Sequence, residues 1–404
     1  MQPLMARRIL EWQKGERVGP WELGVCPTYH CNLKCGICSR SWEGTTHPAL
    51  LNELPDERWL SLIDEAAEAG VRYLSIGGGG EPTMRIELVM AMCVKAKGYG
   101  IGGHLQTNGT RLREQDIQKL IDIKWDHITI SLDGPNAEIN DAIRYRNAFE
   151  ETVKRIAMLN TLKTQSHAVL PELVINTVLT AHNFDILEKM ADFCINNGVQ
   201  YFSVVPLLEY SPDMKEYILT REQQSALPEY VDRAIQKADA AGLAHNLEGL
   251  LSIRKDNEKK QQDAFPEGHI GRTRCLEPWR GIWVSSSGNV APCCYFWDGD
   301  ADTISGTTLH DVWHGPYLTA FRMDMLAGRL PEPCRKCGFP DTLKHKLLVE
   351  CLQSAAADDR PLTAAAFLKK VMKNLRERGM RKSIKRFQQW RLIRKSLQDE
   401  GYDK

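Results

Sequence analysis

The chain has 404 residues, 43% of them hydrophobic and 26% charged, which is enough for a full-sized globular core with one or two smaller units. Lys plus Arg and Asp plus Glu both total 52, so net charge gives no pull toward nucleic acid, and no specific nucleic-acid partner is expected. Neither a signal peptide nor a run of about 18 apolar residues is present. These features argue against a disordered or membrane-spanning chain and predict a cytoplasmic protein.

Short apolar runs alternate with helical patterns between Trp21 and Val205. Amphipathic segments such as Asp56–Ala69 and Arg111–Ile121 predict helices between the runs. The expected strands are Trp21–Val25, Tyr73–Ile76, Gly103–Gln106, His127–Leu132, Leu173–Leu179 and Tyr201–Val205. Such alternation predicts an α/β fold with a parallel sheet. Because turn signals follow the strand ends, chemistry is expected at the carboxyl edge of a barrel or an open sheet.

Changes in composition predict five regions along the chain. An N-terminal extension (1–18) precedes the strand-rich region (19–210), and polar helices with a charged stretch form a connector (211–270). Residues 271–345 are rich in Cys, Gly, Pro and Trp, as expected of a small unit held together by metal. The last region, 346–404, is a basic helical tail.

The tail has twelve Lys and Arg residues between Thr363 and Gln398 against one acid, Glu377. Apolar residues recur there at helical spacing, which predicts two amphipathic helices broken near Gly379. One interpretation is that these helices dock on the rest of the protein and expose a solvated basic face. The other is that they bind anionic lipid, a phosphorylated substrate or an acidic carrier partner.

Three cysteines, Cys31, Cys35 and Cys38, lie within eight residues. Twelve cysteines in a cytosolic-type chain indicate metal binding rather than disulfides. Three thiolates can hold three corners of a four-iron cluster and leave the fourth iron open to chelate a small molecule and pass it an electron. The alternative is a zinc site completed by His30 or His47.

A second group of four cysteines lies near the far end of the chain: Cys275, Cys293, Cys334 and Cys337. Four thiolates can close a cluster completely, and the alternative is a structural zinc ribbon. Nearby aromatic residues are expected to shield the cluster from water rather than stack on a substrate. Trp279, Trp283, Tyr295 and Trp297 are these residues. The remaining cysteines (Cys26, Cys93, Cys194, Cys294 and Cys351) are expected to be ordinary buried thiols.

The C-x3-C-x2-C loop after the first strand resembles the signature of the radical S-adenosylmethionine (SAM) superfamily, and three further segments extend the resemblance. Gly79, Gly80 and Glu81 resemble the GGE motif, whose backbone holds the methionine amino group. Asn108, in Thr107-Asn108-Gly109, resembles the turn that approaches the nucleoside. The segment with Ser131, Asp133 and Arg144 resembles the one in which a serine and an arginine hold the methionine carboxylate. Taken singly, a glycine run is more often a flexible turn, Ser131 a helix cap and Arg144 a surface charge.

The resemblance covers about Trp21 to Val205 and implies a partial (β/α)6 TIM-like barrel that binds SAM and a 4Fe-4S cluster and generates a 5′-deoxyadenosyl radical. One residue departs from the family pattern: Ile37 stands before the third cysteine, where an aromatic residue is frequent.

The second cysteine group resembles the SPASM and twitch extensions of the superfamily. Their G-x4-C spacing, present here from Gly288 to Cys293, favours Cys293 over Cys294 as a ligand. Because the next cysteine, Cys351, stands alone, the shorter twitch form with one auxiliary 4Fe-4S cluster is the better match. A small C-terminal iron–sulfur domain is therefore expected beside the barrel.

The substrate is expected to be a small molecule of the carbohydrate or aminocyclitol kind, since little sequence precedes Cys31 to form a leader-binding domain. Hydrogen abstraction from an unactivated carbon would then end in oxidation, with the auxiliary cluster as electron acceptor and a flavodoxin- or ferredoxin-type protein as reductant. The alternative is a peptide or protein maturase that makes a cross-link, an epimer or a formylglycine-type modification. A non-enzymatic electron carrier with two clusters is a further possibility, but it needs none of the SAM-binding segments.

Overall fold

The computed structural model describes residues 2–42, 52–145, 147–209, 211–251, 265, 268–296, 301–337 and 343–356. The chain divides into two compact units. The strand unit comprises residues 19–253 and 281–319, and the helical unit comprises residues 1–18, 254–280 and 320–404. Each unit thus gathers segments that are far apart in the sequence. The five regions expected from composition are contiguous segments, and this division of the chain stays a prediction.

The strand unit contains a nine-stranded sheet with the order β7-β6-β5-β4-β3-β2-β1-β8-β9. All neighbouring strands are parallel except β8 and β9, which are antiparallel. The strands are β1 (Glu22–Val25), β2 (Tyr73–Ile76), β3 (Gly102–Thr107), β4 (His127–Ser131), β5 (Glu172–Leu179), β6 (Tyr201–Pro206), β7 (Ala244–His245), β8 (Gly281–Val284) and β9 (Val290–Ala291). The sequential order of β1 to β6 confirms the expected α/β fold, and all six expected strands agree with the observed ones within one residue at either end.

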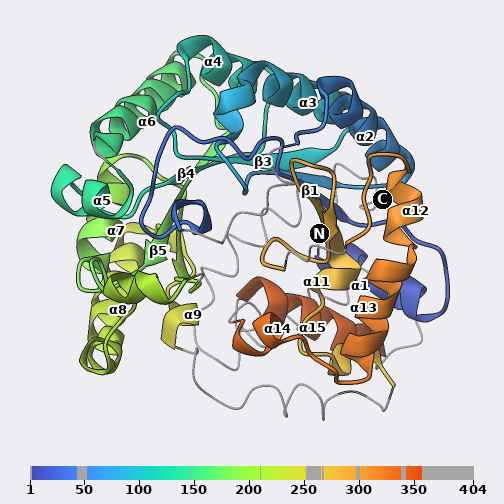
Figure 1. The fold of residues 1–404 in the computed structure, drawn as a ribbon. Helices are drawn as coiled ribbons and strands as arrows, with labels where there is room; N and C mark the ends of the chain where they lie inside the picture. Colours follow the sequence, from blue (N-terminus) through green and yellow to red (C-terminus); the bar gives the residue numbers. More distant parts are fainter. Residues whose placement is uncertain are drawn as a thin grey trace. The chain divides into compact units, whose positions relative to one another are not determined.

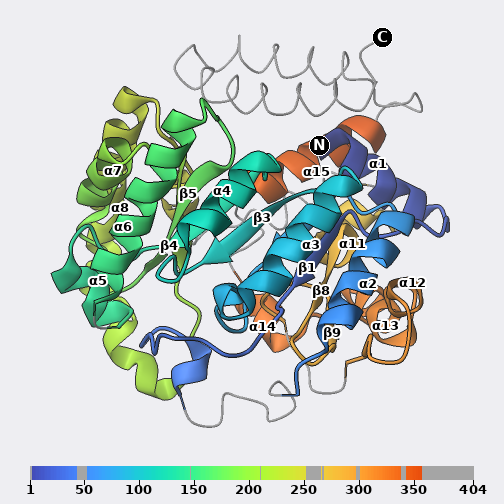
Figure 2. The same ribbon diagram turned by 90° about the horizontal axis from the view of Figure 1, so that it is seen from above.

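Helices cover the outer face of this sheet (Figures 1 and 2). They are α2 (Asp56–Glu68), α3 (Ile86–Gly98), α4 (Glu114–Asp122), α5 (Ala137–Ile143), α6 (Ala148–Gln165), α7 (Leu187–Asn196) and α8 (Arg221–Ala241). The alternation of burial along β5 follows from this cover: Leu173 and Ile175 are fully buried, whereas Val174 and Asn176, which alternate with them, are partly exposed. Successive side chains point to opposite faces of a strand, so the outer face is core and the inner face is left for other contacts.

Helix α2 shows how the sequence specifies this layer. Two acids, Asp56 and Glu57, occupy its first turn, where they interact favourably with the helix dipole. Its buried residues recur at helical spacing and belong to the hydrophobic core of the strand unit. They are Trp59, Leu62, Ile63 and Ala66.

The segment expected as a connector contributes to the strand unit. Helix α8 packs against α7, and β7 extends the sheet beside β6. A short helix, α9 (Glu248–Leu251), follows. The charged stretch expected as a solvated surface, Arg254–Lys260, lies outside the described residues.

The helical unit contains α1 (Gln2–Gln13), α11 (Glu277–Arg280), α14 (Glu332–Lys336) and α15 (Leu343–Ala356). Helix α1 packs against α15 and α11. The rings of Trp12 and Trp279 meet edge to face with centroids 5.7 Å apart, and the buried Arg322 Nε donates to Pro278 O at 2.8 Å. Helix α13 (Pro316–Leu326) runs across the division between the units, and α12 (Leu309–Trp313) belongs to the strand unit.

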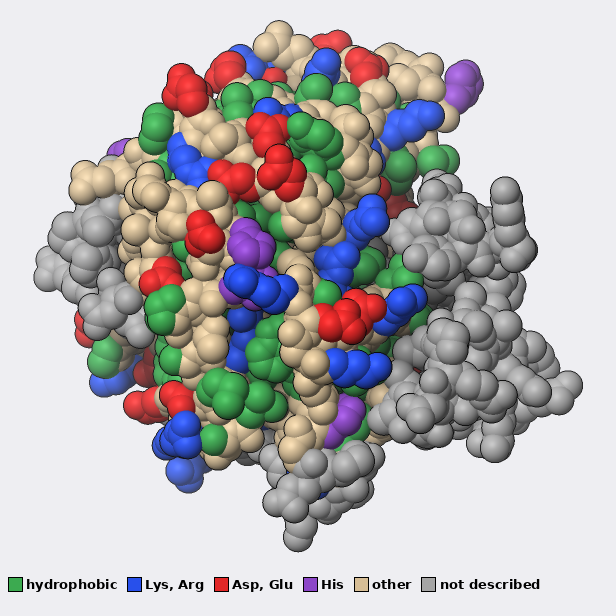
Figure 3. All heavy atoms as spheres, turned by 90° about the vertical axis from the view of Figure 1, so that its right-hand side faces the viewer, with side chains coloured by type: hydrophobic (Ala, Val, Ile, Leu, Met, Phe, Trp, Pro, Cys, Tyr) green, Lys and Arg blue, Asp and Glu red, His purple; other side chains and the backbone are tan. Residues whose placement is uncertain are grey.

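The surface reflects the balanced composition. On the face in Figure 3, acidic and basic side chains are interspersed, with hydrophobic ones scattered among them. Within the described ranges, no helix has the length and apolar character needed to cross a membrane. The two tail helices expected from the sequence lie outside the described residues.

Candidate active site at the carboxyl edge of the sheet

The cysteine loop follows β1, and the residues just before Cys31 are hydrogen-bonded to the glycine run after β2. Gly80 N donates to Thr28 O, and Glu81 N donates to His30 O, both at 2.8 Å. A Cβ on Gly80 would lie 2.1 Å from His30 O, so only glycine allows this contact. The pairing therefore brings the segment before Cys31 against the GGE motif.

Two glycines of the same run have left-handed backbone conformations, with φ of +82° at Gly78 and +65° at Gly79. Both face Cys26, because a Cβ on Gly78 would lie 3.1 Å from its Sγ. The Cys26 thiol is buried and donates to Gly77 O at 3.1 Å. Cys26 thus holds the glycine run in place, a contact that its description as an ordinary buried thiol did not include.

The Glu81 carboxylate is buried and joins the ends of β2 and β3. Its Oε1 accepts hydrogen bonds from Thr83 N at 3.0 Å, Thr83 Oγ1 at 2.7 Å and Thr107 Oγ1 at 2.5 Å. Its Oε2 accepts from Asn108 N at 2.7 Å. Because a carboxylate is an acceptor only, this set of donors suits Glu and no neutral residue. The glutamate of the GGE motif therefore fixes the turn that carries Asn108.

The Asn108 side chain then connects this third turn to the cysteine loop. Its Nδ2 donates to Asn32 Oδ1 at 3.0 Å and lies 4.0 Å from Cys31 Sγ. Asn32 Nδ2 donates in turn to Thr110 Oγ1 at 2.8 Å. Together with the hydrogen bond from Asn108 N to Glu81, these contacts hold the GGE segment, the third turn and the cysteine loop together beside Cys31.

A buried ion pair stands at the end of β4, where Arg144 Nε lies 2.7 Å from Asp133 Oδ2. Asp133 Oδ1 also accepts from Val178 N at 2.7 Å, and its pKa is raised by burial, against the opposing charge of Arg144. The arginine expected to hold the methionine carboxylate of SAM thus already has a carboxylate partner. Ser131, the other residue expected there, is buried at the last position of β4.

The middle of the cysteine loop packs in a small hydrophobic core of its own. Ile37, Ile143, Met214 and Tyr217 form it. Gly36 lies directly against the Tyr217 ring, since a Cβ there would fall 1.9 Å from Tyr217 Oη. Gly36 N also donates to Ile143 O, and Trp42 Nε1 donates to Gly36 O, both at 3.0 Å. Ile37 therefore points into this core.

The thiols of the loop share one electrostatic environment. Burial raises the pKa of the Cys31 thiol and raises that of Cys35 to about 12. The positive charge of Arg144 opposes the rise at Cys35, whereas charge on Cys38 adds to it. Three sulfur donors with a guanidinium beside them form a donor set that suits an iron–sulfur cluster, because the cation offsets the charge of the thiolates.

Sequence reasoning missed two residues that support this loop. Glu53 Oε1 accepts from Thr28 Oγ1 at 2.6 Å and from Tyr29 N at 2.8 Å. Arg85 Nη1 donates to Pro27 O at 2.7 Å and pairs with Glu53 at 3.5 Å. Neither residue belongs to a motif, and only the fold brings them to the same loop.

The candidate auxiliary ligands are divided between the units. Cys293 lies in the strand unit just after β9, with a β-bridge to Phe296. Cys275, Cys334 and Cys337 lie in the helical unit, where Arg274 Nη2 donates to Cys337 O at 3.0 Å. Burial raises the pKa of Cys334 to about 11, the charge of Cys337 adds to this, and Arg274 opposes it.

In the parts of the chain that the structure describes, no three His, Cys, Asp or Glu side chains form a site for a single metal ion.

Two sequence profiles match the chain. The profile of the radical SAM superfamily matches residues 25–194, and that of the SPASM iron–sulfur cluster-binding domain matches residues 275–338. The chain belongs to the radical SAM superfamily. It is an enzyme of the SPASM subgroup, with SAM and 4Fe-4S clusters as cofactors, as the two cysteine groups and the SAM-binding motifs predicted.

Curated relatives of this radical SAM enzyme include a maturase and a peptide cyclase. Mycofactocin maturase MftC of Mycolicibacterium smegmatis is 34% identical over 44% of this chain, and the alignment spans only 41% of that relative. The PqqA peptide cyclase of Ruegeria pomeroyi is 27% identical over 77% of both chains.

Solved structures share the radical SAM fold of the chain. Streptococcus suis SuiB bound to S-adenosylmethionine gives a TM-score of 0.60 with 21% identity, covering 78% of this chain and 71% of SuiB. A structure of anSMEcpe with bound AdoMet gives 0.59 with 18% identity, covering 87% of this chain and 95% of that one. At these identities the likeness concerns the fold alone.

Proposed function

We propose that the enzyme is a peptide maturase that abstracts hydrogen from an unactivated carbon of a peptide substrate. The observation that carries this proposal is the alignment with PqqA peptide cyclase over 77% of both chains, which is long enough to reach beyond the barrel. The small-molecule substrate expected from the sequence rested on the short segment before Cys31. The relatives favour the peptide alternative instead.

Cys31, Cys35 and Cys38 are the proposed ligands of the cluster that binds SAM. When bound, this cluster supplies the electron that opens SAM. The proposed roles of the surrounding residues are to hold the SAM nucleoside (Asn108) and its methionine part (Gly79, Gly80, Ser131). The proposed role of Glu81 is to fix the backbone at Asn108, which agrees with its buried hydrogen bond to Asn108 N. The proposed role of Asp133 is to fix Arg144, which agrees with their buried ion pair and with the hydrogen bond that Asp133 accepts from Val178 N.

Cys275, Cys293, Cys334 and Cys337 are the proposed ligands of the auxiliary cluster. The first site supplies what SAM cleavage needs, so the auxiliary cluster serves a later step, and we propose that it accepts an electron from the substrate radical. The proposed reductant is a flavodoxin- or ferredoxin-type protein.

The peptide proposal is tested by isotope transfer. A short peptide encoded next to the gene is synthesised with deuterium on its side chains and incubated with the anaerobically reconstituted enzyme, SAM and reductant. We expect deuterium in 5′-deoxyadenosine and a modified peptide by mass spectrometry. The triple variant with Ala at Cys31, Cys35 and Cys38 is the control and should form neither. Deuterium transfer from a labelled aminocyclitol but not from the peptide would refute the proposal.

The electron-acceptor role needs a paired measurement. Replacing Cys334 and Cys337 by Ala should leave substrate-independent formation of deoxyadenosine while stopping the oxidised product. If the second cluster serves only to hold the fold together, solubility and both activities should be lost together, because a unit organised by metal unfolds without it. A folded double variant that makes the oxidised product at the parent's rate would refute the role.

A further inference from the structure

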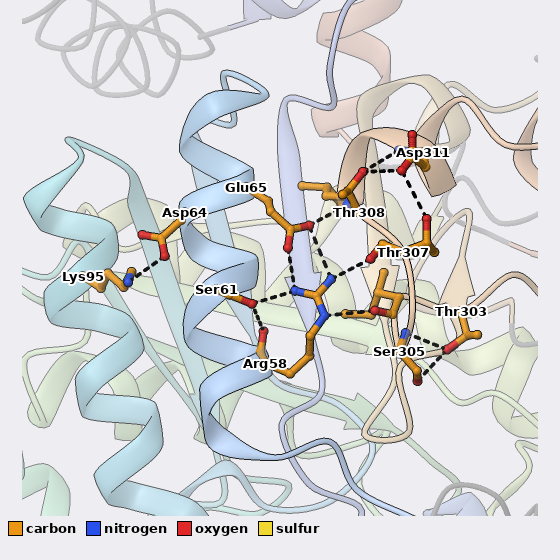
Figure 4. Close-up of polar contacts among 12 residues, drawn as sticks. Arg58, Ser61, Asp64, Glu65, Lys95, Thr303, Ser305, Thr307, Thr308 and Asp311 are labelled. Carbon is orange, nitrogen blue, oxygen red and sulfur yellow. Dashed lines mark hydrogen bonds and ion pairs between the residues drawn. The ribbon is translucent and has the colours of Figure 1, made fainter.

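Helix α2 carries an arginine that binds a segment more than 240 positions away in the sequence (Figure 4). Arg58 Nε donates to Ile304 O at 2.9 Å, and its Nη2 donates to Thr307 O at 3.0 Å. Two different nitrogens of one planar guanidinium thus hold two backbone carbonyls. A lysine has a single ammonium and cannot reproduce this geometry.

Glu65, two turns further along α2, completes the contact. Its Oε1 accepts from Arg58 Nη1 at 2.7 Å, and its Oε2 accepts from Leu309 N, the first residue of α12, at 2.6 Å. The Arg58 and Glu65 side chains are only 15% and 23% exposed. The pair therefore binds the segment from 304 to 309 through both a cation and an anion, largely out of water, where such bonds are stronger.

The bound segment is hydrogen-bonded to the backbone that leads to Cys293. Ile304 N donates to Gly288 O at 2.9 Å, and Val290 N donates to Asp302 O at 2.8 Å. Residues 289 and 303 form a β-bridge between these two bonds. Cys293 follows Val290 by three residues. An unbroken chain of hydrogen bonds thus runs from Arg58 to the strand that presents Cys293.

We propose that Arg58 and Glu65 are positioning residues that set the place of Cys293 as a ligand of the auxiliary cluster. The inference rests on the ligand set proposed above. Both residues act through the backbone and contact neither SAM nor substrate. The barrel helix that follows the first cysteine loop thereby fixes one ligand of the second cluster.

The test measures the auxiliary cluster by itself. Arg58→Gln, Arg58→Lys and Glu65→Gln are made in the background with Ala at Cys31, Cys35 and Cys38, which leaves about four irons for the second site. We expect Arg58→Gln to lose at least half of this iron and to change the electron paramagnetic resonance spectrum of the reduced cluster. Arg58→Lys should lose nearly as much, because the charge alone cannot hold both carbonyls. Glu65→Gln, which keeps the arginine, should lose less.

Asp64→Asn is the matched control. Asp64 lies on the same helix and pairs with Lys95 of α3 at 2.9 Å, with exposures of 39% and 33%, but it does not contact the segment from 304 to 309 (Figure 4). Its iron content and spectrum should match those of the parent. In the chain with all its cysteines, Arg58→Gln should still cleave SAM at the parent's rate, which distinguishes a misplaced ligand from an unfolded barrel.

Parental iron and an unchanged spectrum in Arg58→Gln would overturn the inference. If Arg58→Gln does not fold, Glu65→Gln decides, and a parental spectrum in that variant overturns the inference equally. Cys293→Ala separates the two proposals. Loss of the cluster in Cys293→Ala but not in the Arg58 and Glu65 variants leaves the ligand set standing and removes the positioning role. An intact cluster in Cys293→Ala removes the ligand and the inference with it.

Discussion

Replacing Gly36 by Ala should damage the cysteine loop through one contact. The new Cβ would lie 1.9 Å from Tyr217 Oη, 2.4 Å from its Cζ and 2.9 Å from its Cε2. Neither side can easily move. Gly36 is held by hydrogen bonds at its N and its O, while Tyr217 is 7% exposed and its O accepts from Ala181 N at 2.9 Å. We therefore expect a cost near the upper end of the range for overpacking, about 3 kcal/mol.

Such a cost would lower the equilibrium constant between the native and the non-native loop by roughly 100-fold, since about 1.4 kcal/mol corresponds to a factor of ten. The assay is urea unfolding of the variant, combined with iron content after reconstitution in a chain whose Cys334 and Cys337 are replaced by Ala. Gly98→Ala is the control, because Gly98 ends α3 and has nothing within 4 Å of its Cβ position. That change should be neutral or slightly stabilising.

The same contact gives a rescue test. Tyr217→Ala removes the ring and should recover much of the stability lost in Gly36→Ala, whereas Tyr217→Phe keeps the carbon at 2.4 Å and should recover little. The reasoning would be refuted if Gly36→Ala cost less than about 0.5 kcal/mol, the size of an ordinary surface change. It would also be refuted if Phe rescued the variant as well as Ala.

Three further predictions follow from other parts of the chain. Glu81→Gln places an amide NH2 among groups that donate hydrogen bonds to the present carboxylate, which should displace the turn with Asn108. The affinity for SAM, measured by equilibrium dialysis, should fall about 10- to 100-fold while the iron content of the cluster stays unchanged. A variant with the parent's affinity would contradict this. His345 is 3% exposed, and burial lowers its pKa from about 6.5 to about 4. Between these two pH values the imidazole is protonated in the unfolded chain but neutral in the folded one. The free energy of unfolding should therefore fall as the pH falls from 6.5 to 4, by up to about 3 kcal/mol. His345→Gln should flatten this dependence in urea unfolding, and an equal slope in both proteins would remove the explanation. A chain ending at Ala357 should pellet less with anionic vesicles than the full chain if the basic tail binds lipid, and equal pelleting would exclude that version.

The fold could be predicted from the sequence because its signals are local. Tyr73–Ile76 is a strand with the expected bounds, since a short apolar run between a helix and a glycine-rich turn leaves few alternatives. The cysteine loop and the GGE segment are likewise contiguous motifs, which follow β1 and β2 as expected. Helix α4 begins at Glu114 rather than Arg111, because its first turn is closed by hydrogen bonds between Arg113 and Asp116.

The contacts that organise the site could not be predicted in the same way. Arg85 reaches Pro27 across 58 positions, and Arg58 reaches Thr307 across 249, so neither contact leaves a periodic or spaced pattern in the sequence. The partner of Arg144 could not be predicted either, because the resemblance assigned this arginine to the methionine carboxylate of SAM, and only the structure shows the buried Asp133 beside it. Long-range polar contacts depend on the tertiary fold, which local propensity does not encode.

The alternating burial of β5 has a consequence for how this scaffold can acquire new specificities. Leu173, Ile175 and Leu179 lie in the core, whereas Val174 and Asn176 are partly exposed on the opposite face. Substitutions at the exposed positions leave the core packing intact and so cost little stability. A mutant library restricted to the inner-face positions should therefore retain a high fraction of folded members, while the same diversity on the outer face should yield mostly aggregates. The strands thus separate the residues that can be varied in directed evolution from those that must be kept.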